Sequence, residues 1–221
     1  MTLHWRRRVG PRRNVTLLIA RNDARTLGTL APWLRGRDRL AARALPREHR
    51  RRELLIGRAL LRLVATDGRR ACATRVRLRL WTRRRPLHLS GDRRRRALSL
   101  SHASGWIIAA AAEGGASGRM LGIDIEARDR PLTGRVAGRI PHAGQPTIQD
   151  WCRVEAALKA DARGMSALAL LKPAGPVSHS LARVRMADRT PGVISIMKLF
   201  TLPAGIVGQF ATGSRLGHPS D

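Results

Sequence analysis

The stretch that decides the fold lies in the middle of the chain and reads Leu121-Gly122-Ile123-Asp124-Ile125-Glu126. Ile123 and Ile125 alternate with Asp124 and Glu126, and this two-residue period is typical of a half-buried β-strand. We therefore predict that the two carboxylates point to the same face of one strand.

A second stretch supplies groups that would complete a site around those carboxylates. It reads Trp151-Cys152-Arg153-Val154-Glu155-Ala156-Ala157-Leu158-Lys159. Glu155 and Lys159 are four residues apart on a predicted helix, so they share a face. If this helix packs on the strand, three carboxylates surround one point and an ammonium lies beside them. Oxygen ligands of this kind suit a hard divalent cation such as Mg²⁺.

The composition describes a folded and very basic protein. Its 221 residues are 43% hydrophobic, which is enough for a core and excludes a disordered basic tail. The net charge is +28, with 43 basic residues against 15 acidic ones, so a cluster of three carboxylates is not expected as incidental surface charge. Only three of the basic residues are lysines. Such a charge attracts polyanions: nucleic acid, phosphorylated cofactors or acidic proteins.

The cysteines and the apolar segments indicate in which compartment the protein is expected. Cys72 and Cys152 form neither a disulfide framework nor a metal-ligand spacing, so we expect both to be reduced, buried thiols. The apolar run at 15–20 is too short for a signal-peptide core or a membrane span. We therefore expect a soluble cytoplasmic protein.

The periodicity predicts an α+β fold with two similar α/β subdomains, at 15–108 and 109–221, after a basic, frayed N-terminal tail at 1–14. Helices are predicted at 48–64 and at 150–162, the second with Asp150 as its N-cap. Leu98 and Leu100 are expected to point inward from one strand. The predicted strands are 15–20, 75–80, 98–102, 106–112, the strand with the two carboxylates, 178–186, 192–199 and 206–211.

Five segments occur in an order that resembles the 4′-phosphopantetheinyl transferase superfamily, specifically its longer, surfactin-type branch. The resemblance covers about residues 46–170. It is carried by the helix Glu53–Arg62, Arg85-Pro86 in the place of a Gly-Lys-Pro turn, Leu98–His102 as the Ser-His motif, Gly122–Glu126 as Gly-Val/Ile-Asp-Ile-Glu, and Trp151–Lys159 as Trp-x-x-Lys-Glu-Ala/Ser-x-x-Lys.

This resemblance implies an enzyme that moves 4′-phosphopantetheine from coenzyme A to a serine of an apo acyl or peptidyl carrier protein and releases adenosine 3′,5′-bisphosphate. It also implies two subdomains related by pseudo-twofold symmetry, with the active site between them. The implied partners are coenzyme A and an acidic carrier protein, and a monomer is expected. The carrier, whether of fatty-acid, polyketide, non-ribosomal peptide or siderophore synthesis, is left open.

The resemblance also assigns roles to residues. Asp124, Glu126 and Glu155 would bind Mg²⁺, and Glu155 or a water beside it would take the serine proton. Lys159 would hold the diphosphate and stabilise the leaving group. For coenzyme A, the implied contacts are Ser101 and His102 with a phosphate and Arg85 with the nucleotide end. Glu53 stands where the family has an arginine for the 3′-phosphate, and Arg51, Arg52 and Arg58 are candidates to replace it.

Two other functions compete with this one. An Arg-rich nucleic-acid-binding protein would account for the charge of +28, although the chain has no zinc-finger spacing or RNA-recognition aromatic motif and the three carboxylates would then have no role. A weakly active, degenerate transferase is motivated by Glu53, by Val154 in the place of a lysine, and by the short connection at 127–150. Nucleic acid and membranes are not expected as partners of the transferase.

Overall fold

The computed structural model describes residues 3–9, 15–66, 77–79, 88–90, 96–112, 119–138, 140, 145–161, 168, 171–173, 181–186, 193–199 and 202–214. The described residues up to Ala112 form one compact unit, and those from Arg119 onward form a second. Both units combine helices with antiparallel strands. Among the helices described here, none has the length and apolar character needed to cross a membrane.

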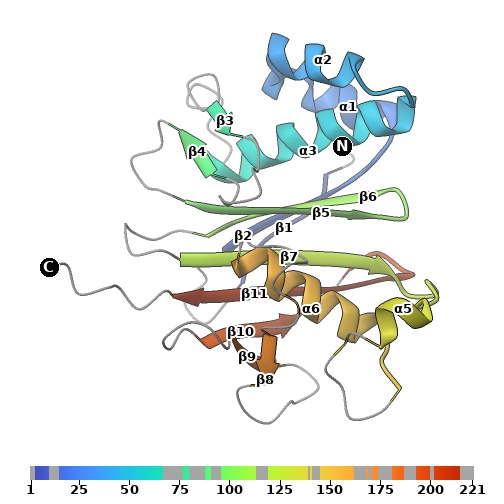
Figure 1. Ribbon diagram of the computed structural model, residues 1–221. Coiled ribbons are helices and arrows are strands. Elements are labelled where there is room, and N and C mark those ends of the chain that lie inside the picture. The colour runs from blue at the N-terminus through green and yellow to red at the C-terminus, as the bar shows by residue number, and fades with distance from the viewer. Residues whose placement is uncertain are drawn as a thin grey trace, which may run out of the picture. The chain divides into compact units, whose positions relative to one another are not determined.

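The first unit is an antiparallel sheet in the order β1-β2-β6-β5-β4-β3. Its strands are β1 (Leu3–Val9), β2 (Val15–Arg21), β3 (Arg77–Arg79), β4 (His88–Ser90), β5 (Ala97–Ala103) and β6 (Trp106–Ala112). Its helices are α1 (Ala24–Leu30), the 3-10 turn η1 (Ala31–Trp33), α2 (Gly36–Arg43) and α3 (Glu48–Ala65). Helix α3 contacts β2, β5 and β6, and α1 and α2 contact α3 (Figure 1).

The broad apolar face of α3 explains this packing, and the predicted helix at 48–64 is confirmed. Ile56, Leu60 and Val64 are buried against Leu18 of β2 and Ile107 of β6 in one core. Leu98 is buried in the same core, whereas Leu100 is only partly buried. Ser99 and Ser101 are buried too, so β5 lacks the exposed polar face that its alternation predicts.

Two predictions about the first unit need correction. Residues 3–9 are not a frayed tail: they form β1, which pairs antiparallel with β2 from Leu3↔Ala20 to Val9↔Val15. The run Arg6-Arg7-Arg8 conceals a strand that is stabilised by pairing along the edge of β2. The predicted subdomain boundary between residues 108 and 109 falls inside β6, which pairs with β2 and β5 along its whole length.

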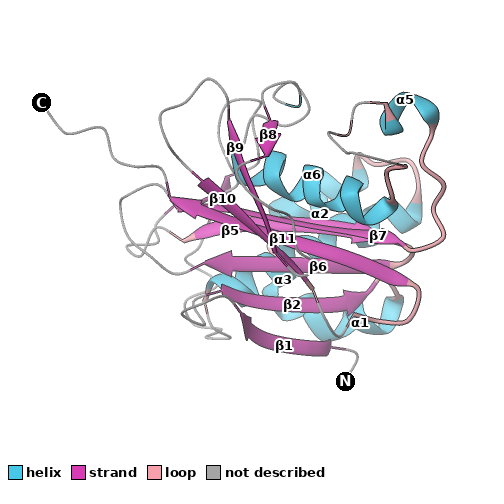
Figure 2. Ribbon diagram, turned by 90° about the horizontal axis from the view of Figure 1, so that it is seen from below, coloured by secondary structure: helices cyan, strands magenta, loops and turns pink. Residues whose placement is uncertain are grey.

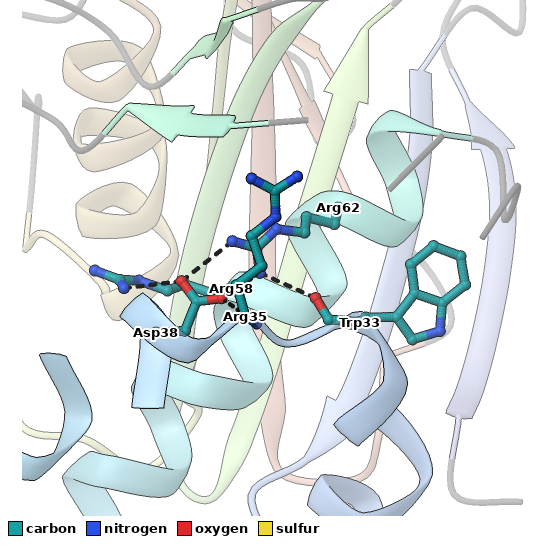
Figure 3. Close-up of polar contacts among 5 residues, drawn as sticks. All are labelled: Trp33, Arg35, Asp38, Arg58 and Arg62. Atoms are coloured by element: carbon teal, nitrogen blue, oxygen red, sulfur yellow. Dashed lines mark hydrogen bonds and ion pairs between the residues drawn. The ribbon is translucent and has the colours of Figure 1, made fainter. Parts of the chain in front are cut away.

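A buried ion-pair network joins α2 to α3 (Figure 3). The Asp38 carboxylate accepts hydrogen bonds from Arg62 Nη1 at 2.6 Å, Arg58 Nη1 at 3.0 Å and the Arg35 backbone N–H at 2.9 Å. Arg62 also donates to the Trp33 carbonyl at 3.0 Å. Burial by itself raises the pKa of Asp38, but the hydrogen bonds from Arg62, Arg35 and Arg58 outweigh it and hold the pKa below its usual value. Asp38 therefore stays ionised between two guanidinium groups.

The second unit is an antiparallel sheet in the order β7-β11-β10-β9-β8, with α6 against it (Figure 2). Its strands are β7 (Arg119–Ala127), β8 (Leu171–Pro173), β9 (Leu181–Met186), β10 (Val193–Lys198) and β11 (Ile206–Ser214). Its helices are α5 (Gly134–Ala137) and α6 (Ile148–Asp161). Helix α6 contacts β7, β11 and β10, and its apolar residues form the core of this unit with Ile194, Ile196, Val207 and Ala211.

The start of α6 differs from the prediction. The helix begins at Ile148, so Asp150 lies in its first turn and is not the N-cap. The Thr147 backbone N–H donates to Asp150 Oδ2 at 2.8 Å, and the Asp150 backbone N–H donates to Thr147 Oγ1 at 3.3 Å. This reciprocal arrangement is a capping box, with aspartate in the place of the usual glutamate.

Some predictions fall on positions that the structure does not describe. They include Cys72, Arg85, the parts of the predicted strand 75–80 outside Arg77–Arg79, and positions 162, 178–180 and 192 at the ends of other predicted elements. The pseudo-twofold relation between the two units stays a prediction.

We predict that Asp38→Asn lowers the free energy of unfolding by about 3–5 kcal/mol, because it leaves two guanidinium groups buried without a carboxylate. Urea unfolding followed by circular dichroism measures the change. The matched control is Glu48→Gln, which removes an exposed partner of Arg52 and should cost less than about 1 kcal/mol. Equal losses in the two variants would contradict a structural role for the Asp38 network.

Candidate metal centre

The site depends on a close approach between β7 and α6 at Gly122. A Cβ on Gly122 would lie 1.8 Å from the Ala156 carbonyl oxygen and 2.5 Å from the Ala160 nitrogen, both backbone atoms of α6. Only glycine allows this distance, because neither backbone atom can move independently of the helix. Positions 124 and 126 share the face of Gly122, so the same approach brings their side chains to α6.

Three carboxylates meet on this face, as predicted from the two motifs. Asp124 and Glu126 extend from β7 and Glu155 extends from α6, and one oxygen from each lies within 4.8 Å of the others. Asp124 and Glu126 are buried, and Glu155 is partly buried. The strand is buried on both faces here, since Ile123 and Ile125 are also inaccessible. The predicted half-buried strand is therefore more enclosed than its alternation indicates.

Two basic side chains neutralise part of this acidic cluster. Lys159 Nζ donates to Asp124 Oδ1 at 2.7 Å, and Arg130 Nη1 forms an ion pair with Glu126. The hydrogen bond to Glu126 is the main cause that raises the pKa of Arg130 further, so this guanidinium stays charged. The two cations do not fully neutralise the three carboxylates. The negative charge that remains on the cluster favours binding of a divalent cation.

Burial and neighbouring charges change the pKa of Glu155 and of the adjacent Cys152 thiol. Burial is the main cause that raises the pKa of Glu155 to about 7; the charge of Asp124 adds to this, and Lys159 opposes it. Burial is likewise the main cause that raises the pKa of the Cys152 thiol, and the nearby carboxylates raise it further. Cys152 is a free, buried thiol, which confirms that prediction, and it stays protonated next to Asp124.

Arg130 is a residue of this cluster that the sequence analysis missed. It follows the end of β7 in the connection to α5, among other arginines and prolines, where no periodicity marks it. Val154 is buried in the apolar core of the second unit, where a lysine would have to bury its charge. The absence of a lysine there therefore reflects packing of the apolar core.

Of the predicted coenzyme A contacts, Lys159 lies on α6 of the second unit, Arg85 lies outside the described residues, and the others belong to the first unit. His102 Nδ1 contacts the Glu53 carboxylate, which also accepts a hydrogen bond from Arg50 at 2.9 Å. Arg52 is paired with Glu48 near the start of α3, and Ser101 is buried in β5.

Arg58 and Arg51 do not suit the phosphate role considered for them. Arg58 is 8% exposed and is held by Asp38, so we withdraw its predicted contact with coenzyme A. Arg51 Nε donates to the Leu45 carbonyl at 2.6 Å and so holds the segment before α3. Arg52 is left as the candidate at the surface of α3.

We predict that Gly122→Ala destabilises the protein by about 2–4 kcal/mol, because the new methyl group separates α6 from β7. Chemical unfolding measures the loss, and binding of Mn²⁺ should weaken in parallel. The control is Gly134→Ala at the start of α5, where a Cβ meets no atom within 4 Å. A Gly122→Ala variant as stable as this control would contradict the close approach.

We predict that, in EDTA, the stability of the protein falls as pH rises from about 4.5 to about 7. In this window the unfolded Glu155, with an ordinary pKa of 4.5, is ionised, whereas the folded carboxyl keeps its proton up to about pH 7. The loss amounts to at most about 3 kcal/mol. Thermal unfolding across this pH range, compared with Glu155→Gln, isolates the contribution. An unchanged pH profile in that variant would show that Glu155 titrates normally.

Comparison with known proteins assigns the chain to no family. No protein-family model matches it, and no curated protein matches it either. The chemistry of the site is therefore derived from its own residues.

Proposed function

We propose that this protein is a Mg²⁺-dependent 4′-phosphopantetheinyl transferase that acts on an apo carrier protein. The observation that carries the proposal is the convergence of Asp124, Glu126, Glu155 and Lys159, which come from the two motifs of the resemblance. Glu155 lies 29 residues after Glu126 in the sequence, yet the charged groups of the two motifs share one face of the second unit.

The donor set fits a magnesium ion. All three candidate ligand atoms are carboxylate oxygens, and their mutual distances of up to 4.8 Å permit one cation to contact each of them. The Cys152 thiol beside Asp124 is held protonated and does not compete for a metal. Bound Mg²⁺ would supply charge stabilisation for the diphosphate oxygens.

The reaction that we propose is displacement at phosphorus. The serine oxygen of the carrier protein forms a bond to the phosphorus that bears the pantetheine arm, and the bond from this phosphorus to the oxygen of adenosine 3′,5′-bisphosphate breaks. Lys159 stabilises the negative charge on the departing oxygen. Arg130 provides a second cation beside the same carboxylates.

The serine proton needs an acceptor. Without a metal the pKa of Glu155 is raised to about 7, so its carboxylate is more basic than that of an ordinary glutamate. As a third metal ligand Glu155 would be a weaker base. The serine would then lose its proton to a water that Glu155 holds, so the two roles that we assign to Glu155 remain compatible.

A basic surface on the first unit supports an acidic partner. Exposed arginines follow one another along α2 and into α3; they are Arg37, Arg39, Arg43, Arg47, Arg50 and Arg51. With a net charge of +28, such a surface increases the rate of encounter with an acidic carrier protein, and this effect decreases with salt.

We predict that the protein adds one phosphopantetheine arm to an apo carrier protein in the presence of coenzyme A and Mg²⁺, and that EDTA abolishes the gain. Intact-protein mass spectrometry measures it. Asp124→Asn should abolish transfer while the fold is kept. Lys159→Met should lower kcat about 10²–10³-fold and leave the KM for coenzyme A almost unchanged, because its charge matters most in the transition state.

The controls separate the competing functions. Thr29→Ala, which removes an exposed hydroxyl that donates to the Arg25 carbonyl on α1, should transfer at the normal rate. No transfer by a folded protein that still binds coenzyme A would favour a degenerate member. Absence of both transfer and coenzyme A binding, together with tight binding of nucleic acid that falls steeply with salt, would overturn the proposal in favour of a nucleic-acid-binding protein.

A further inference from the structure

Gln209 is a polar side chain in a place that favours an apolar one. It lies within the β11 run Ile206-Val207-Gly208-Gln209-Phe210-Ala211, and the remaining residues of this run are all apolar or glycine. Its exposure is only 2%. A buried amide loses its hydrogen bonds with water, so a residue of this kind is retained where it meets a polar partner.

The register of the sheet places Gln209 beside the carboxylates. It pairs directly with Asp124 across β11 and β7, between the pairs Val207↔Glu126 and Ala211↔Gly122. Val207 and Ala211 belong to the core that α6 covers. Because side chains alternate along a strand, Gln209 projects to this same face, and directly opposed Cβ atoms in an antiparallel pair lie about 5 Å apart.

The amide nitrogen of Gln209 has no hydrogen-bond partner within the described part of the chain. This donor is buried and adjacent to a carboxylate that Lys159 holds through Oδ1. An unpaired donor of this kind costs stability, and a methionine of similar volume would avoid that cost. We therefore expect the Gln209 amide to find its hydrogen-bond partner in the metal-bound state of the protein.

We propose that Gln209 is a positioning residue for Asp124: its amide donates a hydrogen bond to the Asp124 carboxylate when a divalent cation binds the cluster. The inference rests on the metal centre of the proposed function and deepens it. A bound cation would compete with Lys159 for the Asp124 carboxylate, and the Gln209 amide would then fix the orientation of that carboxylate. Hydrogen bonds to ligating carboxylates tune metal affinity in this way, typically by 10- to 100-fold.

The test is Mn²⁺ affinity, measured by electron paramagnetic resonance on the full chain, with Mg²⁺ as competitor. Gln209→Met should weaken Mn²⁺ binding at least about 10-fold, and Gln209→Leu should do the same. In EDTA, the midpoint of thermal unfolding of Gln209→Met should equal or exceed that of the wild type, because an unpaired amide is removed. A purely structural glutamine would instead give a lower midpoint.

The matched control is Thr212→Val, a polar-to-apolar change on β11 at a position that alternates to the opposite face. It should bind Mn²⁺ as the wild type does. Wild-type affinity in Gln209→Met, or a lower midpoint of that variant in EDTA, would overturn the inference.

These outcomes are distinct from those of the transfer assay. Weaker Mn²⁺ binding by Gln209→Met, in a protein that does not modify carrier proteins, would keep this inference and remove the transferase. Transfer by the wild type together with unchanged Mn²⁺ affinity in Gln209→Met would support the transferase and overturn the role of Gln209. If the wild type binds no Mn²⁺ at all, the metal centre is wrong and the role of Gln209 fails with it.

Discussion

The second unit depends on the absence of one side chain. At Gly122 the backbone of β7 approaches that of α6 so closely that a methyl group would collide with the Ala156 carbonyl. Two positions further along β7, Asp124 can therefore reach Lys159, a residue of α6, at hydrogen-bond distance. A wider separation would exceed the reach of an aspartate side chain, and the carboxylates of strand and helix would no longer share one site.

The charge balance of this cluster determines what it can bind. Lys159 and Arg130 offset two carboxylates, while crowding and burial keep Glu155 near half protonation at neutral pH. The metal-free cluster is thus almost neutral, which is how a buried group of three acids can exist in a folded protein. In the proposed transferase, binding of a divalent cation would displace a proton from Glu155 and release Lys159 and Arg130 from the carboxylates. Both basic groups would then be available to an anionic substrate.

Arginine has two physical roles in this chain. On α2 and at the start of α3 it forms an exposed basic surface, whereas Arg58 and Arg62 are buried and hold Asp38 between them. Arg96 is also buried, and it donates to the carbonyls of Val64 and Ala65 at the end of α3. The planar guanidinium serves these internal roles because it satisfies several acceptors at once. The net charge of +28 is therefore not only a measure of what the protein attracts.

The sequence by itself determined the strand at β7, the helices α3 and α6, and the meeting of Asp124, Glu126, Glu155 and Lys159, because short-range periodicity places like side chains on one face. It did not predict β1, since a strand of arginines is defined by its partner and not by its own pattern. Arg58 was misplaced for a similar reason. Its sequence position matches that of an exposed helical arginine, and only the packing of α2 against α3 brings Asp38 to it. Arg130 and Gln209 likewise became visible only in the tertiary structure. Their partners are set by the end of a strand and by the register between β7 and β11, and neither depends on the residues nearby in sequence.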